Sequence, residues 1–310
     1  MQGKEKVTKS RRVEHMSLEG FCTFVKTGIS HVLGNAAEVT VDKVLKNNGT
    51  RLYGLTIKEK GSNLAPTIYL EGFYERYLEG EDISSIEKEI LFIYKSEKPA
   101  ICFDTGFVKD WENVKRNVVC RVINCELNKE KLEGIPYFQF LDLAVTFSVL
   151  VETGGLPCSG SFTIHNSHIM MWGVTADELY TVALENTRRL EKPEIIRLGD
   201  ALMEIVGKEV VSGEGYMPDM YIFTNKKKLH GASCLLFTDM LQELADKIGS
   251  DLFIIPSSIH EAIIVPRTEE VDSSELDGMV NIVNAEQVQP EEILSDHVYK
   301  FTRETGKVTM

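Results

Sequence analysis

The run Ser257-Ser258-Ile259-His260-Glu261 places a nucleophile, a base and a carboxylate within five residues. Such a set would suit a hydrolase in which the histidine activates a serine. In an extended chain, however, His260 and Glu261 point to opposite faces, and Ser258 stands about 6.5–7 Å from His260, too far for a hydrogen bond unless the chain turns sharply. The Gly-x-Ser-x-Gly elbow of α/β-hydrolases is also absent. The spacing favours a hydrogen-bonded connection between strands. It leaves Ser258, His260 and Glu261, with Asn225 from elsewhere in the fold, as candidates for a hydrolase alternative.

Other motifs for metals or phosphates are incomplete. His260-Glu261 begins a zinc-protease-like string, but Ile264 stands where the second histidine ligand should be. His165 and His168 form a closer pair, yet no cysteine or carboxylate follows at a matching spacing. Neither a Walker loop nor G-x-G-x-x-G is present. We therefore expect no metal and no cofactor, and we interpret Lys226-Lys227-Lys228 as a solvated turn.

The elements that must position the 257–261 loop lie between Met220 and Pro266. Alternation and apolar runs predict strands, and apolar spacing predicts one helix that Gly249 ends in a left-handed cap. The predicted strands are Met220 to Asn225, Ala232 to Phe237, Leu252 to Ile255 and Ala262 to Val265, and the helix is Asp239 to Ile248. We take this stretch as the core of the larger part of the chain.

Elsewhere the patterns are local. Phe140 to Val151 alternates with the period of a strand, and Asp142 faces away from its apolar set. We interpret Asp142 as lying on the solvent side of a half-covered sheet, with a buried polar partner as the alternative. Thr175 to Glu178 fits a capping box at a helix start. Glu194 to Val210 and Pro290 to Tyr299 are predicted as helices, the second followed by a polar tail.

The domain organisation follows from shifts in composition. Residues 1–14 form a basic tail, 15–98 a small α+β unit and 115–310 a larger α+β domain, with mixed or antiparallel sheets and packed helices. In the small unit, Asn47-Asn48-Gly49-Thr50 predicts a tight hairpin. Residues 99–114 are an ordered connection, because Phe107 and Trp111 are too apolar to lie free in water.

The net charge of −13 is unevenly distributed. From Glu191 to Met310 there are 22 Asp/Glu and 11 Lys/Arg. Such a surface repels nucleic-acid phosphates and anionic membranes, and it suits a basic protein partner. No apolar run approaches the roughly 20 residues of a membrane span, and no signal peptide follows the basic tail, so we expect a cytoplasmic protein. Six scattered cysteines without a C-x-x-C pair indicate reduced thiols.

Several strings of the chain together carry a resemblance to a known family. They are Leu55-Thr56-Ile57, Ala65 to Leu70, Phe140 to Val145, Pro256 to Glu261 and Glu291 to Asp296. In these strings the chain resembles the DUF5688 proteins of gut Firmicutes. Its second half is distantly similar to the DUF1444 group, through Trp172-Gly173-Val174 and the helix from Glu178-Leu179 to Glu185-Asn186. The resemblance implies a cytoplasmic, accessory role, linked to mobile elements, and it implies no catalytic residues.

These observations favour a non-catalytic binding or regulatory protein that acts through its acidic surface on a basic host or nucleic-acid-binding partner. A hydrolase with a site near the 257–261 loop is one alternative. A structural subunit of a homo-oligomer is another.

Overall fold

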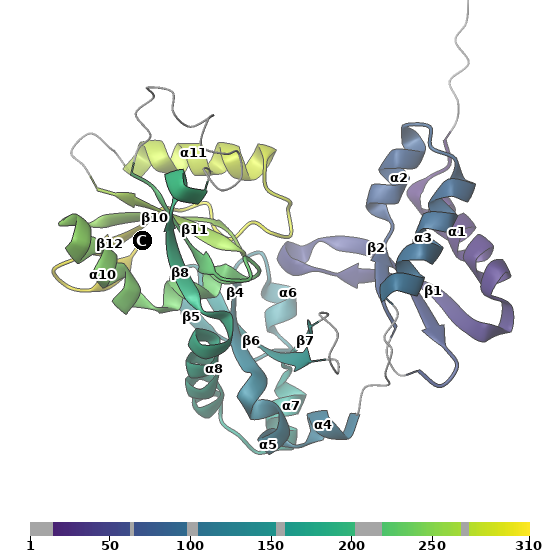
Figure 1. The fold of residues 1–310 in the computed structure, drawn as a ribbon, viewed down its shortest axis with the longest axis horizontal. Helices are drawn as coiled ribbons and strands as arrows, with labels where there is room; N and C mark the ends of the chain where they lie inside the picture. The colour runs from purple at the N-terminus through teal and green to yellow at the C-terminus, as the bar shows by residue number, and fades with distance from the viewer. Residues whose placement is uncertain (1–14, 63–64, 98–104, 153–158, 202–218, 268–272) are drawn as a thin grey trace, which may run out of the picture. The chain divides into compact units, whose positions relative to one another are not determined.

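The computed structural model describes residues 15–62, 65–97, 105–152, 159–201, 219–267 and 273–310. The chain divides into two compact units, one formed by Met1–Leu45 and Arg51–Phe103 and the other by Lys46–Thr50 and Asp104–Met310. Each combines helices with a sheet or sheets, and every strand pair in the described ranges is antiparallel (Figure 1). This confirms the α+β class.

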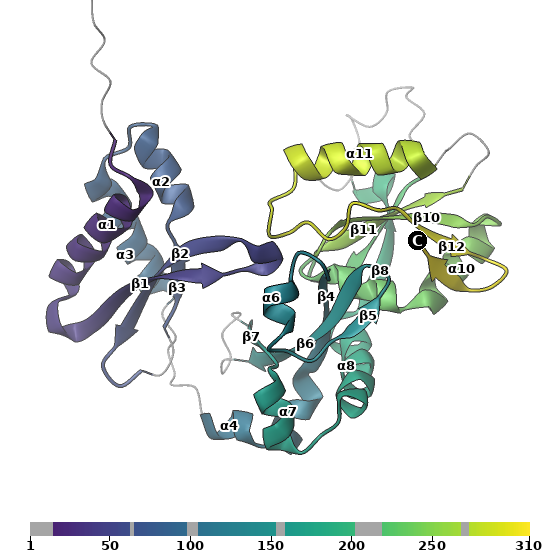
Figure 2. The same cartoon turned by 180° about the vertical axis from the view of Figure 1, so that it is seen from behind.

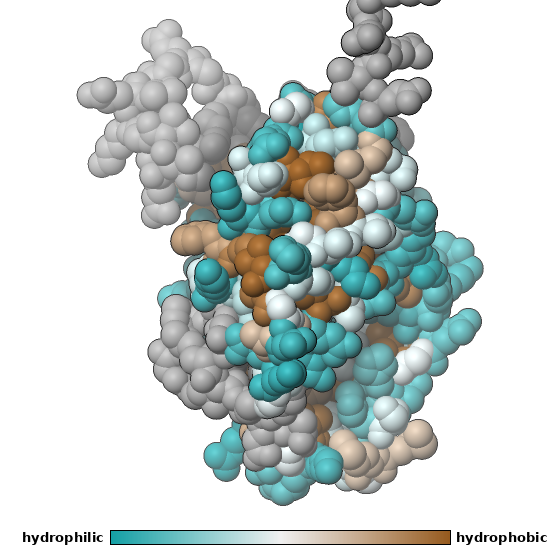
Figure 3. Space-filling model, turned by 90° about the vertical axis from the view of Figure 1, so that its right-hand side faces the viewer, coloured by the Kyte–Doolittle hydropathy of each residue, from teal (hydrophilic) through white to brown (hydrophobic). Residues whose placement is uncertain are grey.

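In the described part of the smaller unit, three helices pack on a sheet of order β1-β2-β3. Its elements are α1 (Leu18–Leu33), β1 (Ala37–Leu45), β2 (Arg51–Glu59), β3 (Thr67–Tyr69), α2 (Glu71–Leu78) and α3 (Ile83–Glu97). The predicted Asn-Gly turn between β1 and β2 is confirmed, since Asn48 and Gly49 have φ values of 57° and 72°. Apolar side chains also gather on one face of the molecule (Figure 3). Among the residues of the smaller unit, Phe24, Val32 and Phe92 are exposed large apolar side chains.

The first half of the larger unit is built around β6. In the described residues this strand pairs with β4 on one side and with β5 and β7 on the other. The elements are α4 (Thr105–Lys109), α5 (Trp111–Val114), the 3-10 turn η3 (Lys115–Asn117), β4 (Val118–Asn124), α6 (Lys129–Leu132), β5 (Phe138–Phe140), β6 (Leu143–Glu152), β7 (Ser159–Thr163), α7 (Asn166–Trp172) and α8 (Ala176–Glu191). The capping box of Thr175 and Glu178 begins α8, as its sequence predicts.

The second half is a sheet of order β13-β12-β10-β11-β9-β8 in the described residues. Its elements are β8 (Pro193–Arg197), β9 (Tyr221–Asn225), the 3-10 helix η4 (Gly231–Leu236), α10 (Thr238–Ile248), β10 (Leu252–Ser258), β11 (Glu261–Pro266), α11 (Ser273–Glu286), β12 (Tyr299–Thr302) and β13 (Lys307–Thr309). Leu252 and Ile254 face the core under α10, whereas Phe253 and Val280 form a separate cluster under α11. The two helices therefore cover opposite faces of the sheet (Figure 2).

The predicted core stretch is confirmed at β9, α10, β10 and β11, and Gly249 caps α10 with φ 80°. The predicted strand from Ala232 to Phe237 is wrong, because Gly231–Leu236 is a 3-10 helix. This run is buried in the main core, and burial on all sides gives the same apolar sequence in either conformation.

Two other helix predictions differ from the structure. Residues 194–197 of the first, predicted over 194–210, belong to β8, which pairs with β9; residues 198–201 are helical, and 202–210 lie outside the described residues. Edge pairing with a formed sheet outweighs the local helical pattern there. The second, 290–299, contains no helix and ends in β12, and the expected polar tail contains β13.

The predicted helix at 290–299 does not form because the carbonyl groups of residues 290–295 have other hydrogen-bond partners. Asn47, Asn48, Asn124 and Asn284 donate side-chain hydrogen bonds of 2.7–3.0 Å to the carbonyls of residues 290, 291, 293, 294 and 295. These bonds occupy the acceptors that a helix would need.

None of the helices in the described ranges is long and apolar enough to cross a membrane.

Candidate functional site

The 257–261 loop is a tight connection between β10 and β11. Ser258 and Glu261 are the last pair of the ladder, so Ile259 and His260 alone form the turn. The Ser258 hydroxyl accepts a hydrogen bond of 3.1 Å from the backbone N–H of His260. Glu261 is the strand partner of Ser258 and pairs with it through the backbone. The side chain of Ser257 lies outside the described part of the chain. Ser258 therefore supports the turn.

The His260 ring holds neighbouring segments to this turn. Its Nδ1 accepts a hydrogen bond of 3.1 Å from the backbone N–H of His230, which assigns the proton of the neutral ring to Nε2. Nε2 lies 3.4 Å from Oε1 of Glu292. The backbone N–H of Ile259 also donates to the carbonyl of Glu292, at 2.9 Å. Both ring nitrogens thus have partners that belong to the fold.

Asn225 is engaged in a different turn. Its fully buried side chain donates 2.9 Å to the carbonyl of Leu229 and accepts 3.0 Å from the N–H of Lys227. These bonds close the 225–229 turn, in which Lys226 to Lys228 are exposed, as their interpretation as a solvated turn requires. The structure brings the turns that carry Asn225 and His260 together, but it does not join their side chains into one constellation.

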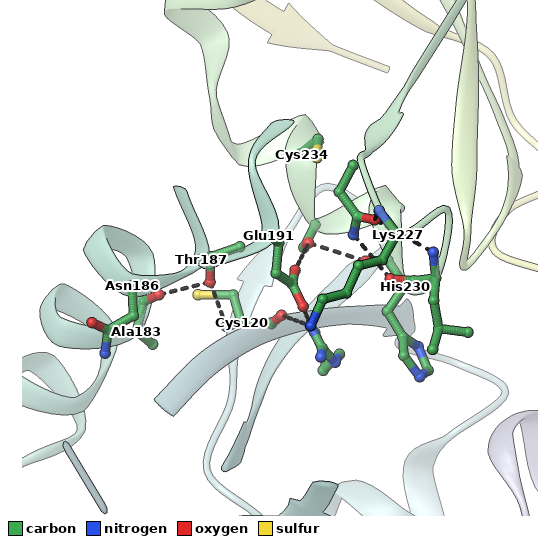
Figure 4. A network of polar contacts seen from close by, with 12 residues as sticks. Cys120, Ala183, Asn186, Thr187, Glu191, Lys227, His230 and Cys234 are labelled. Carbon is green, nitrogen blue, oxygen red and sulfur yellow. Dashed lines mark hydrogen bonds and ion pairs between the residues drawn. The ribbon is translucent and has the colours of Figure 1, made fainter. Parts of the chain in front are cut away.

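A buried ion pair beside these turns was missed by the sequence reasoning. Nη1 of Arg121 on β4 lies 2.6 Å from Oε1 of Glu191 at the end of α8, and the two residues are 8% and 2% exposed. Ser233 of η4 donates to the other carboxylate oxygen at 3.3 Å (Figure 4). Burial raises the pKa of Glu191, and the guanidinium counters part of that rise. A charged residue inside the apolar strand 118–124 was the available signal.

The same helix protects the free edge of β4 (Figure 4). The Thr187 hydroxyl accepts from the N–H of Cys120 at 2.8 Å, and the Asn186 amide donates to the carbonyl of Val118 at 3.0 Å. Side chains of α8 thus take the place of a neighbouring strand. Burial raises the pKa of the Cys120 thiol to about 12, so this thiol is protonated at neutral pH.

His230 lies close to both His260 and Arg121. It adopts a left-handed conformation with φ 54°, and its ring centroid is 5.6 Å from that of His260. Burial, followed by electrostatic interactions with Arg121, His260, Lys131 and Lys46, lowers the pKa of His230 to about 4. The neutral ring is therefore the form that fits the folded chain.

This shift predicts a pH dependence of stability. Because the pKa of His230 falls from 6.5 to about 4 on folding, its contribution is complete above pH 6.5 and is lost as the pH falls toward 4. Asparagine tolerates the left-handed backbone, so His230→Asn should reduce the slope of the free energy of unfolding against pH by up to about 1.4 kcal/mol per pH unit in this range. Urea unfolding at several pH values measures this slope. Equal pH profiles for the two proteins would contradict this assignment.

Asp142 has a buried polar partner, so its interpretation as a solvent-facing residue is wrong. It lies in the two-residue turn between β5 and β6, where its carboxylate accepts hydrogen bonds from the Tyr299 hydroxyl and, at 2.6 Å, from the Ser295 hydroxyl. Both donors are fully buried. Burial and the neighbouring carboxylate raise the pKa of Tyr299. The turn thereby fixes the C-terminal segment to the sheet around β6.

The histidine pair at 165 and 168 serves a helix start. Nδ1 of His168 accepts 3.0 Å from the N–H of His165, completing a cap at the beginning of α7. Among the described residues, no group of three or more His, Cys, Asp or Glu side chains could hold a metal ion.

Comparison with known proteins gives one result. The family of unknown function DUF5688 matches residues 18–303 of the chain. Searches of curated proteins and of solved structures gave no match. Because the match covers nearly the whole length, including β10, the 259–260 turn and the segment 290–295, the chain belongs to the DUF5688 family.

Proposed function

We propose that the protein is a non-catalytic, cytoplasmic binding or regulatory protein that acts through its acidic surface on a basic protein partner. The observation that carries the proposal is the charge of residues 191–310, where 22 acidic residues face 11 basic ones. A surface of this sign attracts basic partners and accelerates their association.

A hollow beside the C-terminal end of α10 gives this surface a definite feature. It has a volume of about 430 Å³ and is lined by Asp246, Gly249, Ser250, Asp251, Arg303 and Glu304. Two of its carboxylates have arginine partners, since Nε of Arg303 lies 2.7 Å from Asp246 and Nη1 of Arg267 lies 3.5 Å from Asp251. Glu304 is exposed and has no ion pair among the described residues. The negative end of the helix dipole adds to these charges, so the hollow suits a lysine or arginine side chain.

The contacts of the hydrolase candidates support binding over hydrolysis. The Ser258 hydroxyl, both His260 nitrogens and the Asn225 amide are bonded to groups that hold turns together. A general base needs a nitrogen within reach of the proton that it removes.

Affinity capture tests the proposal. The double variant Glu243→Gln and Glu304→Gln removes the exposed carboxylate of Glu304 in the hollow and that of Glu243, three residues before Asp246 on α10. It should weaken salt-sensitive capture of a basic protein about three- to tenfold. The measurement is retention of lysate proteins on immobilised wild type and variant, with salt elution.

The matched control is Glu133→Gln with Glu185→Gln, which removes two exposed carboxylates elsewhere in the larger unit. This control should retain the same protein as wild type. If no basic protein is retained, or if both double variants retain it equally, the acidic hollow is not the docking surface.

A further inference from the structure

A groove of about 560 Å³ runs along α8 in the larger unit. Glu178, Val182 and Asn186 stand four residues apart and share the face of α8 that lines it. The lining also includes Trp111, Trp172, Lys115 and Arg116. The volume lies within the roughly 300–1,000 Å³ of small-molecule sites. The groove is distinct from the hollow at α10.

The tryptophans make one side of the groove aromatic and rigid. Their ring centroids are 5.5 Å apart, and Nε1 of Trp172 donates 2.7 Å to the carbonyl of Val108. His168 stacks against Trp172 with its centroid 5.4 Å away and the planes 19° apart. A ring held in place in this way stacks on a planar ligand with little loss of freedom.

Cationic side chains stand beside the aromatic rings. Lys115 is paired with Glu112 at 2.5 Å, whereas the exposed Arg116 guanidinium has no ion pair or hydrogen bond among the residues that the structure describes. The Asn186 amide donates 2.7 Å to the carbonyl of Lys115 and so fixes η3 against α8. A free guanidinium suits the paired oxygens of a phosphate.

Glu178 supplies an acceptor in the same groove. Its Oε2 accepts from the N–H and hydroxyl of Thr175 at 2.8 and 3.0 Å, and these bonds lower the pKa of the carboxyl. Oε1 has no partner among the described residues. An ionised oxygen in this position accepts a hydrogen bond from an amino group on a ring.

We propose that the groove along α8 binds a nucleotide, with an amino-substituted base on Trp111 and Trp172, its amino group on Glu178 and its phosphate on Arg116. No phosphate-loop motif marks the groove in the sequence, because its contacts come from side chains of four separate elements, α5, η3, α7 and α8. This binding goes beyond the proposed protein interaction and uses a different surface of the same unit.

Fluorescence titration of the full chain with AMP tests this proposal. Trp111 and Trp172 are the chain's two tryptophans, so the whole tryptophan signal comes from the groove. AMP should change this signal in a saturable way, and Arg116→Gln should weaken its binding about tenfold because one charge-assisted contact is lost. Adenosine and inorganic phosphate, which each lack one half of the ligand, should bind more weakly than AMP.

Lys247→Gln is the matched control, since it removes one exposed positive charge from α10. It should bind AMP as wild type does. The proposal is overturned if AMP gives no saturable change, confirmed by calorimetry, if Arg116→Gln binds AMP as tightly as wild type, or if adenosine or phosphate alone binds as tightly as AMP.

Discussion

Replacing Arg121 with alanine is expected to lower the free energy of unfolding by about 3–5 kcal/mol. The substitution leaves the Glu191 carboxylate, 2% exposed, without the guanidinium that lies 2.6 Å away. It also removes the hydrogen bond of 2.9 Å from Arg121 to the carbonyl of Cys120, at the protected edge of β4. Urea denaturation followed by circular dichroism measures the change.

Two comparisons separate the buried charge from a general loss of contacts. Arg121→Met together with Glu191→Leu should recover most of the stability, since apolar side chains of similar volume replace both charges. Arg197→Ala breaks an exposed ion pair, in which the side chains of Arg197 and Asp219 are 55% and 57% exposed. This substitution should lower the free energy of unfolding by at most about 1 kcal/mol. A cost for Arg121→Ala no larger than that for Arg197→Ala would contradict this role of the pair.

Short-range signals in the sequence were sufficient for much of the fold. The hairpin at Asn48 and Gly49, the cap at Thr175 and Glu178 and the alternation of β6 depend on residues close in the chain. Each involves a backbone or side-chain preference that neighbouring residues reveal. The α+β class followed from these elements and is confirmed.

The features that the sequence did not predict depend on partners far apart in the chain. Arg121 and Glu191 are separated by 70 residues, and Asp142 and Tyr299 by 157. The pattern around Asp142 shows only that it does not belong to the apolar set of the run 140–151, not that the Tyr299 hydroxyl donates a hydrogen bond to it. Similarly, a strand such as β8 forms because β9 offers an edge, which a local helical pattern does not reveal.

The 257–261 loop illustrates the same limit at a candidate site. The sequence correctly favoured a hydrogen-bonded connection, because its residues could not form a complete triad by local spacing. It could not supply the partners of His260, which come from His230 and Glu292. The two hydrogen-bond partners explain the position of the His260 ring, which connects the 259–260 turn to His230 and to Glu292.

Gly231→Ala is expected to lower the free energy of unfolding by about 3 kcal/mol, since overpacking at a rigid contact forces the backbone apart. A Cβ there would lie 2.4 Å from the carbonyl oxygen of His260, 2.9 Å from the N–H nitrogen of Asn225 and 2.2 Å from the Thr224 hydroxyl. Two of these atoms belong to the backbone and cannot rotate away. Thermal and urea unfolding measure the loss.

Gly278→Ala provides the opposite control, because Gly278 lies within α11 and no described atom beyond its chain neighbours and the helix's own backbone lies within 4 Å of the new methyl group. It should stabilise the protein by about 0.5–1 kcal/mol through helix propensity. Adding Thr224→Ala to Gly231→Ala removes the hydroxyl contact but leaves the His260 carbonyl, so the double variant should stay destabilised. If Gly231→Ala proves as stable as wild type, the 259–260 turn does not pack on η4 as closely as these distances require.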